Sequence, residues 1–291
     1  MQDPKKNPEE CDKTTCSSCA YSSSCSSAKE KGDPDAKLKN RLSRIRRKIV
    51  VMSGKGGVGK STVAVNLAMA AMLSGQRVGL LDVDLHGPSV PTMLGLEGQK
   101  LLGTDDGIMP VSVGGLSVLS VGFLLNSPDD PVVWRGPMKM SVIRQFIEEV
   151  SWGDLDLLVI DAPPGTGDEP LTICQLIPDL DGAVIVTSPQ RVASVDVRKS
   201  ICFCKQLNVK VLGVVENMSG FVCPHCGESI PILGQGGGAK MAEELEVPFL
   251  GSIPIDPSIA QSGDAGKAFV ESSASSPAAG AVREILRNLY Q

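Results

Sequence analysis

A glycine-rich stretch with two lysines is the part of this sequence best suited to chemistry. It reads Gly54-Lys55-Gly56-Gly57-Val58-Gly59-Lys60-Ser61 and lies between an apolar segment typical of a strand, 49–52, and an Ala- and Leu-rich helical pattern, 60–74. Backbone N–H groups of such a loop can surround phosphate oxygens, Lys60 can reach the β and γ phosphates, and the Ser61 hydroxyl can bind Mg²⁺. The sequence therefore predicts a site for a nucleoside triphosphate.

Three acidic residues follow apolar segments that are typical of buried strands. Asp82 and Asp84 come after the segment 78–81, and Asp161 follows the segment 155–160. Ligands of α/β proteins bind at the carboxyl ends of the strands, so these side chains are expected beside the phosphates. A carboxylate there can hold Mg²⁺ through water or orient the attacking water in phosphoryl transfer. Paired aspartates after a strand are also common in solvated turns, and that alternative stays open for Asp82 and Asp84.

Two cysteines occur in the run Cys223-Pro224-His225-Cys226, downstream of another strand-like segment, 211–215. Thiolates at this spacing can chelate one soft metal centre, but two ligands do not complete a tetrahedral site. A dimer would supply four thiolates, so a single [4Fe–4S] cluster or a zinc ion could bridge two subunits across a two-fold axis. A redox-active dithiol and a structural zinc knuckle are the alternatives, because this spacing serves all three.

Four more cysteines fall in a short N-terminal stretch with the spacing C-x4-C-x2-C-x5-C. Residues 1–36 contain almost no aliphatic side chains, so this tail cannot bury enough apolar surface to fold by itself. Four thiolates suffice for one ferredoxin-like [4Fe–4S] cluster or one all-cysteine zinc site, and ligand type does not separate iron from zinc. The predicted ligands are Cys11, Cys16, Cys19 and Cys25.

Composition limits the class of protein. The chain has 291 residues, a formal net charge of −5 and nine cysteines. The negative charge gives no overall attraction to polyanions, so no nucleic-acid partner is expected. No apolar run approaches the roughly 18 residues of a membrane span and the N-terminus lacks an apolar signal, so we expect a cytoplasmic protein without a membrane partner. The remaining cysteines are expected as buried small side chains of helices: Cys174, Cys202 and Cys204.

Strand-like and helix-like segments alternate along the chain. After 49–52, strand-like segments occur at 78–81, 155–160, 183–187, 211–215 and 249–253. Further helical patterns occur at 137–150, 193–207, 239–245 and 277–290, and the Gly-rich segment 95–122 is a candidate for an antiparallel pair. The alternation predicts an α/β fold, with a doubly wound, mostly parallel sheet flanked by helices. The expected regions are a cysteine-rich metal-binding tail, 1–36, a basic linker helix, 37–48, and a P-loop ATPase domain, 49–291.

Four motifs in order resemble the Mrp/Nbp branch of the deviant Walker A P-loop ATPases, a superfamily that includes ParA, MinD and the nitrogenase iron protein. The motifs are KGGVGKS, DVDLHGPS, DAPPGTGD and CPHC, and the resemblance covers essentially the whole chain. The C-x2-C-x5-C ending of the tail is similar to the N-terminal extension of the Nbp branch, which carries a tightly held cluster. The first cysteine, Cys11, lies closer to the others than in the family spacing, and at this point the chain departs from the family pattern.

The resemblance implies roles for individual residues. Lys55 would reach the phosphates bound by a partner subunit, so a homodimer follows, and Asp84 would position water while Asp82 is structural. Gly165 would contact the γ-phosphate through its N–H and Asn217 would contact adenine, although an Asn at a strand end is equally a turn former. The implied catalytic residues are Lys55, Lys60, Asp84 and Asp161. The implied nucleotide-binding residues are Gly54, Lys55, Gly56, Gly57, Val58, Gly59, Lys60, Ser61, Thr62, Gly165 and Asn217, with Ser61 as the Mg²⁺ ligand.

The resemblance also implies a function: an ATP-binding and slowly ATP-hydrolysing scaffold or carrier that assembles a [4Fe–4S] cluster at a homodimer interface and transfers it to apo-proteins. Its ligands would be ATP, Mg²⁺, a cluster bridging Cys223 and Cys226 of two subunits, and a second cluster on the N-terminal cysteines. Two alternatives share the fold and the phosphate chemistry, namely ATP-dependent iron–sulfur electron transfer and a metal-free positioning ATPase of the ParA/MinD kind. The metal-spaced cysteines argue against the second.

Overall fold

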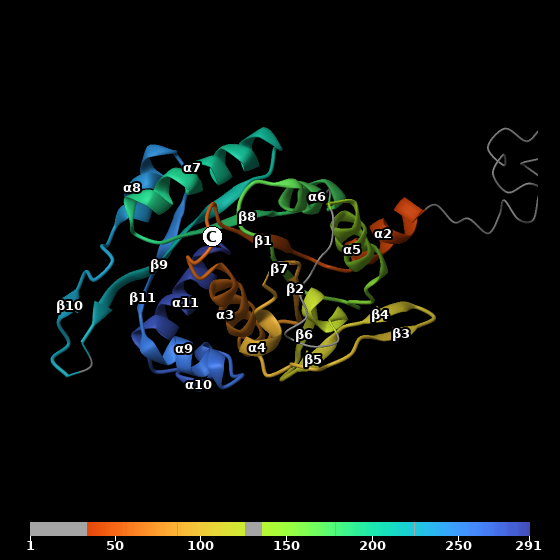
Figure 1. Ribbon diagram of the computed structural model, residues 1–291, viewed down its shortest axis with the longest axis horizontal. Coiled ribbons are helices and arrows are strands. Elements are labelled where there is room, and N and C mark those ends of the chain that lie inside the picture. The colour runs from red at the N-terminus through yellow and green to blue at the C-terminus, as the bar shows by residue number, and fades with distance from the viewer. Residues whose placement is uncertain (1–33, 86, 126–135, 178, 224) are drawn as a thin grey trace, which may run out of the picture. The chain divides into compact units, whose positions relative to one another are not determined.

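The central sheet of the protein collects strands from most of the chain (Figure 1). The structure, a computed structural model, describes residues 34–291 except 86, 126–135, 178 and 224. Its strands are β1 (Lys48–Met52), β2 (Val78–Asp82), β3 (Leu102–Thr104), β4 (Gly107–Met109), β5 (Val111–Val113), β6 (Leu116–Ser120), β7 (Leu157–Asp161), β8 (Gly182–Thr187), β9 (Val211–Val222), β10 (Ser229–Ile230) and β11 (Phe249–Ile255). Its helices are α2 (Pro34–Ser43), α3 (Lys60–Leu73), α4 (Val90–Met93), η3 (Val121–Leu124), α5 (Gly136–Glu149), α6 (Asp168–Leu176), α7 (Arg191–Gln206), α8 (Gly237–Glu244), α9 (Pro257–Asp264), α10 (Phe269–Ser272) and α11 (Pro277–Asn288).

The sheet is mostly parallel, as predicted. Within the described residues its strand order is β10-β9-β8-β1-β7-β2-β6-β5, and β11 also pairs with β9. The pairs β5–β6 and β9–β10 are antiparallel, and the other pairs of this sheet are parallel. Since β1 pairs with β7 on one side and β8 on the other, the loop that leaves β1 starts from the middle of the sheet. In open α/β sheets ligands bind at such a position, beyond the carboxyl ends of the strands.

Helices cover both faces of the sheet. Helices α3 and α11 pack on one face, whereas α7 and α8 pack against β8 and β9 on the other (Figure 1). The doubly wound α/β prediction is therefore confirmed. None of the described helices is long and apolar enough to cross a membrane.

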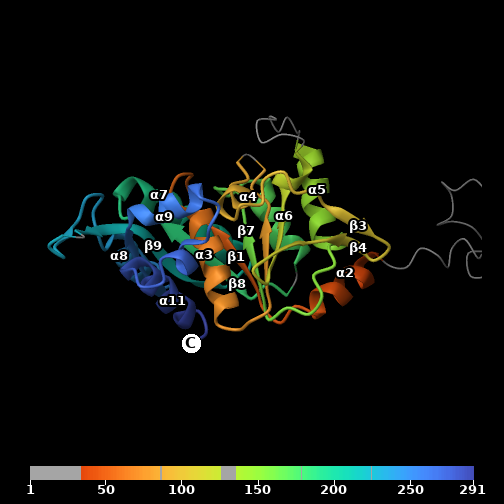
Figure 2. The ribbon, with the colours of Figure 1, turned by 90° about the horizontal axis from the view of Figure 1, so that it is seen from below.

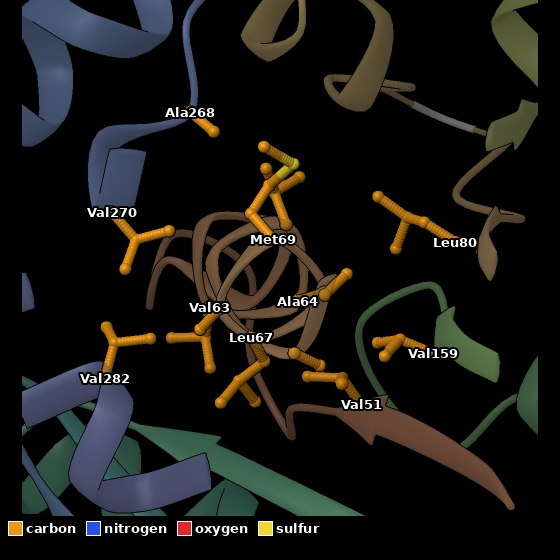
Figure 3. Close-up of a cluster of buried hydrophobic side chains, with 14 of the residues drawn as sticks. Val51, Val63, Ala64, Leu67, Met69, Leu80, Val159, Ala268, Val270 and Val282 are labelled. Carbon is orange, nitrogen blue, oxygen red and sulfur yellow. The ribbon is translucent and has the colours of Figure 1, made fainter. Parts of the chain in front are cut away.

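Helix α3 is the centre of the core. Figure 3 looks along this helix and shows Val63 and Leu67 surrounded by Val51 of β1, Val159 of β7 and Val282 of α11. A helix that is apolar on nearly all sides is stable only when it is buried on all sides. Each large side chain that is buried here contributes about 1.5–3 kcal/mol to folding. This packing fixes the N-terminus of α3, which directly follows the glycine-rich loop.

The basic helix predicted for residues 37–48 has different bounds in the structure. Helix α2 ends at Ser43. Ile45 then forms an isolated parallel bridge with Leu155, and the Arg46 N–H donates to the Leu155 carbonyl at 2.9 Å. The last part of the expected helix is therefore extended, because pairing with a distant segment replaces the local helical hydrogen bonds.

Two other predictions can be compared with the structure. The segment 95–122 contains two antiparallel pairs, β3 with β4 and β5 with β6, which confirms the expectation for this region. Cys204 is buried and Cys174 is half-buried, but Cys202 is exposed, so the prediction of burial is wrong for Cys202. Residues 202 and 204 lie on one helix, α7, where positions two apart point to different faces.

Candidate nucleotide site and cysteine hairpin

The glycine-rich loop joins β1 to α3, as its sequence predicts. Gly57 and Gly59 have φ angles of 81° and 78°, a left-handed conformation that glycine adopts at little cost. Gly59 is the N-cap residue of α3 and the Val63 N–H donates to its carbonyl at 2.9 Å. The loop therefore presents its backbone N–H groups at a helix N-terminus, which favours an anion such as phosphate.

Two other elements press closely on this loop. A Cβ atom on Gly54 would lie 2.1 Å from the carbonyl oxygen of Asp196 in α7. A Cβ atom on Gly59 would lie 2.2 Å from Nδ2 of Asn217 in β9. Real Cβ atoms do not approach other atoms so closely. At Gly54 the neighbour is rigid backbone, and at Gly59 the positive φ also favours glycine. The loop is thus seated between α7 and β9.

Lys60 is the charged centre of the site. Its Nζ lies 2.5 Å from Oδ1 of Asp161, 3.5 Å from Oδ2 of Asp84 and 3.2 Å from Oγ of Ser61. Only 6% of Lys60 is exposed and Asp161 is fully buried. The structure therefore brings together four residues from three separate segments of the sequence, and each was predicted to lie at the phosphates.

The second oxygen of Asp161 is a candidate partner for a metal-bound water. Oδ2 of Asp161 is buried and has no hydrogen-bond partner among the described residues. Burial raises the pKa of this carboxyl group, and the adjacent Lys60 ammonium group opposes that rise. Together with the Ser61 hydroxyl, the unpaired oxygen forms a hard oxygen donor set that fits Mg²⁺. Mg²⁺ held there would, together with Lys60, neutralise negative charge at the phosphates.

Asp82 belongs to the same carboxylate group but has other partners. Its Oδ2 accepts a hydrogen bond from the Ser120 hydroxyl at 2.7 Å, and its Oδ1 accepts from the Asp84 N–H at 3.1 Å. Burial, followed by the negative charge of Asp161, raises the pKa of Asp82 to about 8. The raised pKa favours the protonated acid, and the two hydrogen bonds hold the turn after β2, in line with the structural role expected for Asp82.

Two residues of the predicted site stand apart from the buried group. Lys55 is exposed. The N–H of Gly165 donates to the Ser53 carbonyl at 2.7 Å. This N–H can contact a γ-phosphate only after the 162–168 loop moves and breaks that hydrogen bond, which sequence reasoning did not predict.

A cavity of about 570 Å³ opens beside the first turn of α3. The predicted residues Thr62 and Asn217 lie on its wall. Nδ2 of Asn217 donates to the Val58 carbonyl at 2.9 Å, so this side chain contacts both the phosphate loop and the cavity. A cavity next to a phosphate site is where the base and ribose of a nucleotide can lie.

The predicted thiols lie at the end of a hairpin. Strand β9 extends to Val222, well beyond the expected 211–215, and pairs antiparallel with β10. The hairpin projects away from the sheet in both views (Figures 1 and 2). Cys223 is half-buried and Cys226 is exposed, and the Cys223 N–H donates to the Glu228 carbonyl at 2.9 Å. Hydrogen bonds from the Cys226 and His225 N–H groups lower the pKa of the Cys223 thiol, which favours the thiolate that binds metals.

The part of the chain that the structure describes places no third metal ligand beside the two thiols. Among residues 34–291, with the stated gaps, no group of three or more His, Cys, Asp or Glu side chains could hold a metal ion. The N-terminal cysteines, Cys11, Cys16, Cys19 and Cys25, lie outside the described residues, so their role stays a prediction.

The comparisons with known proteins decide the family. Residues 44–290 match a family model described as ParA: NUBPL iron-transfer P-loop NTPase. The chain belongs to this family. The matched residues include the phosphate loop, the carboxylate group and the cysteine hairpin.

Relatives and solved structures agree with the family. The chain is 51% identical over 259 residues to an iron-sulfur cluster carrier protein of Methanocaldococcus jannaschii, covering 88% of this chain and 89% of the relative. It is 49% identical over 253 residues to the cytosolic Fe-S cluster assembly factor NUBP2 homolog of Nematostella vectensis, covering 85% and 94%. The solved structure of a nucleotide-binding protein of Archaeoglobus fulgidus in complex with ADP is 42% identical in sequence and has a TM-score of 0.72. The match covers 81% of this chain and 92% of that chain.

Sequence reasoning missed part of the cavity wall of this NUBPL-type NTPase. Asp256 and Phe269 line the cavity from the segment that follows β11. Asp256 caps α9, where its side chain accepts from the Ser258 N–H at 2.9 Å. The signal was available, because Asp256-Pro257 directly after an apolar strand is a typical helix start. No pattern in the sequence, however, places that start against α3.

Proposed function

We propose that this protein binds Mg-ATP, hydrolyses it slowly, and assembles a [4Fe–4S] cluster that it transfers to apo-proteins. The cluster is held by Cys223 and Cys226 from each of two subunits. The observation that carries the proposal is the thiol pair at the tip of the hairpin, with Cys223 half-buried and Cys226 exposed, which supplies half of a four-thiolate site. Relatives named as iron-sulfur cluster carriers and assembly factors support it.

The nucleotide half of the proposal rests on the carboxylate and lysine group. Lys60 and the loop N–H groups would bind the β and γ phosphates, Ser61 and Asp161 would hold Mg²⁺, and Asp84 would orient the attacking water. This set supplies positioning and charge, with no strong base, so hydrolysis is slow in the absence of a partner. The family of ParA-type NTPases and a neighbouring structure in complex with ADP support a nucleotide at this site.

The dimer half of the proposal rests on two exposed groups. Two hairpins facing each other would complete a tetrahedral set of thiolates, and Lys55 would reach the phosphates of the partner subunit. In transfer, each bond from iron to a carrier cysteine is replaced by a bond to an acceptor thiolate, with no change of oxidation state. The exposure of Cys226 gives acceptor thiolates access to the cluster.

Two further parts of the proposal concern location and the tail. The cysteines Cys11, Cys16, Cys19 and Cys25 would hold a second, tightly bound [4Fe–4S] cluster. We place the protein in the cytoplasm, in line with the relatives named as cytosolic assembly factors.

Anaerobic reconstitution with iron and sulfide tests the proposal. Iron, sulfide and the visible absorption band are measured for the wild type and for the double variant Cys223→Ser/Cys226→Ser, with Cys202→Ser as the matched control on an exposed helical cysteine. We expect the double variant to lose one cluster per dimer while the control and the tail cluster are unchanged. The reconstituted protein is then mixed with an apo-ferredoxin, whose activity should rise as the carrier loses iron.

Three outcomes would contradict the proposal in different ways. A cluster that stays in place while electrons leave would indicate an electron-transfer protein. Zinc bound at the hairpin, with no iron–sulfur band, would indicate a structural knuckle. A reconstituted protein without any metal would indicate a positioning ATPase of the ParA/MinD kind.

A further inference from the structure

Glu216 is a buried acid that belongs to neither the nucleotide site nor the thiol pair. It is fully buried on β9, next to Asn217. Its carboxylate accepts hydrogen bonds from the Ser219 hydroxyl at 2.5 Å, from the Gly236 N–H at 2.8 Å and from the Gly238 N–H. A buried carboxylate is costly unless donors surround it in this way.

These donors come from both legs of the cysteine hairpin. Ser219 lies on the leg that leads from β9 to the thiols, whereas Gly236 and Gly238 lie where the chain returns into α8. The carboxylate also faces the N-terminus of α8, where a negative charge is favourable. One side chain therefore holds the outgoing and the returning leg together.

The strand itself is irregular between Glu216 and the thiols. From Asn217 to Phe221, β9 advances four residues while its neighbour β11 advances only two, from Ile253 to Ile255. Within this bulge Met218 has a φ of 59°, which is rare for a residue other than glycine. A bulge interrupts the ladder of hydrogen bonds, so the sheet alone does not set the direction of the hairpin. The Glu216 carboxylate supplies the missing constraint.

The returning leg is built to approach this part of the sheet closely. A Cβ atom on Gly238 would lie 3.0 Å from Cβ of Glu216 and 3.1 Å from Cγ2 of Thr187. A Cβ atom on Gly237 would lie 2.4 Å from the Pro189 carbonyl oxygen. The glycines therefore allow the leg to reach the carboxylate.

The other end of this connection is the phosphate loop. Asn217, the residue after Glu216, donates to the Val58 carbonyl, and its amide fills the space that a Cβ on Gly59 would need. A shift of the loop on nucleotide binding would therefore move Asn217, and Glu216 would move with it through one peptide unit. We propose that Glu216 is a positioning residue that couples the nucleotide state of the phosphate loop to the position of the cysteine hairpin. The coupling to cluster handling rests on the proposed function.

The test measures hydrogen exchange of backbone amides in the full, cluster-free chain, with and without Mg-ATP. The variants are Glu216→Gln, which keeps the shape and loses one acceptor oxygen, and Ser219→Ala, which keeps both backbone donors. The matched control is Glu228→Gln, the same change at an exposed position of the same hairpin. Thermal melting verifies that each variant is folded.

In the wild type we expect Mg-ATP to protect residues 54–62 and to change exchange in residues 227–238 by roughly 5-fold or more, a typical coupling between two sites. In Glu216→Gln the loop stays protected and the change in the hairpin falls to about 1-fold, because the link is broken. Ser219→Ala loses a smaller part of the change, and Glu228→Gln loses none. Ser219→Ala keeps the test decisive if Glu216→Gln fails to fold.

A merely structural role for Glu216 gives a different result. It would lower the melting temperature and leave the response of the hairpin to Mg-ATP intact, which would overturn the proposal. A wild-type hairpin that does not respond while residues 54–62 are protected would also overturn it. Failure of the cluster reconstitution would overturn the proposed function alone, because the exchange experiment contains no cluster.

Discussion

The nucleotide site and the cysteine hairpin are constructed in opposite ways. Around Lys60 the side chains are buried and paired, and one oxygen of Asp161 stands without a partner among the described residues. At the hairpin the thiols of Cys223 and Cys226 are half-buried or exposed, and the described part of the chain offers no third ligand. The buried carboxylates and lysine of the nucleotide site all come from one chain. The hairpin offers only two of the four thiolates that a cluster needs, so a second molecule would have to supply the rest.

The largest effect is expected from Lys60→Ala, which removes the centre of the buried site. ATP hydrolysis should fall at least about 100-fold, as is typical when a group that stabilises transition-state charge is lost. The variant also leaves Asp161 buried without its cation, which costs on the order of 3–5 kcal/mol of unfolding free energy. Hydrolysis assays and urea unfolding measure both effects, with Lys210→Ala on the surface as the control.

The comparison predicts that Lys60→Ala impairs the nucleotide site and leaves the cysteine hairpin unaffected. Reconstituted Lys60→Ala should still bind iron and sulfide through Cys223 and Cys226, since these thiols do not contact the lysine. Loss of the hairpin cluster in a folded Lys60→Ala protein would show that the open site depends on the buried one.

Lys55→Ala should have the next largest effect, because Lys55 is exposed and would act only across a dimer. Hydrolysis should fall about 10-fold or more, in line with the loss of one charged contact to the phosphates. Unfolding free energy should change by less than about 0.5 kcal/mol, as for other surface substitutions. Light scattering with and without Mg-ATP measures the dimer directly. A variant that dimerises normally with ATP would place the role of Lys55 within its own subunit.

Asp82→Asn tests how burial at the nucleotide site makes the unfolding free energy depend on pH. Because the folded pKa of Asp82 is raised from 3.8 to about 8, the folded chain holds a proton that the unfolded chain releases above about pH 4. This contribution to stability is fully present below pH 4 and is lost as the pH rises toward 8, with a slope of up to about 1.4 kcal/mol per pH unit. Asn does not titrate, so the variant should lose this slope. Urea unfolding at pH 5, 6, 7 and 8 measures it.

The control for this experiment is Asp105→Asn, at an exposed position, which should keep the slope of the wild type. An Asp82→Asn protein with the same pH dependence as the wild type would mean that Asp82 is ionised in the fold. Ser120 and the Asp84 N–H would then stabilise a carboxylate in place of a carboxylic acid.

The smallest effect is expected from Cys226→Ser on the cluster-free protein. This exposed side chain contributes little packing, so the unfolding free energy should change by less than about 0.5 kcal/mol. Calorimetric unfolding measures the change, and Cys204→Ser, at a buried cysteine, should cost clearly more because a hydroxyl replaces a thiol in an apolar environment. A large destabilisation by Cys226→Ser would indicate that the hairpin is structural and closed.

The sequence by itself determined the chemistry and the order of the elements. The phosphate loop 54–61 could be predicted because glycines and lysines at this spacing are typical of phosphate binding. The strands that carry Asp84 and Asp161 were predicted because parallel strands buried on both faces are continuous apolar runs. The spacing of Cys223 and Cys226 made them a candidate metal site, and that spacing can be seen without knowledge of the fold.

Only the tertiary structure decided which distant residues meet. It placed Lys60 against Asp161, a contact across 101 positions, and it ended α2 at Ser43 through the pairing of Ile45 with Leu155. The sequence also could not predict the raised pKa of Asp82 or the three hydrogen-bond donors around Glu216, because both depend on which segments pack around these buried side chains. Periodicity and spacing describe neighbours along the chain, whereas burial, pairing and pKa depend on neighbours in space, and these exist only after the sheet has formed.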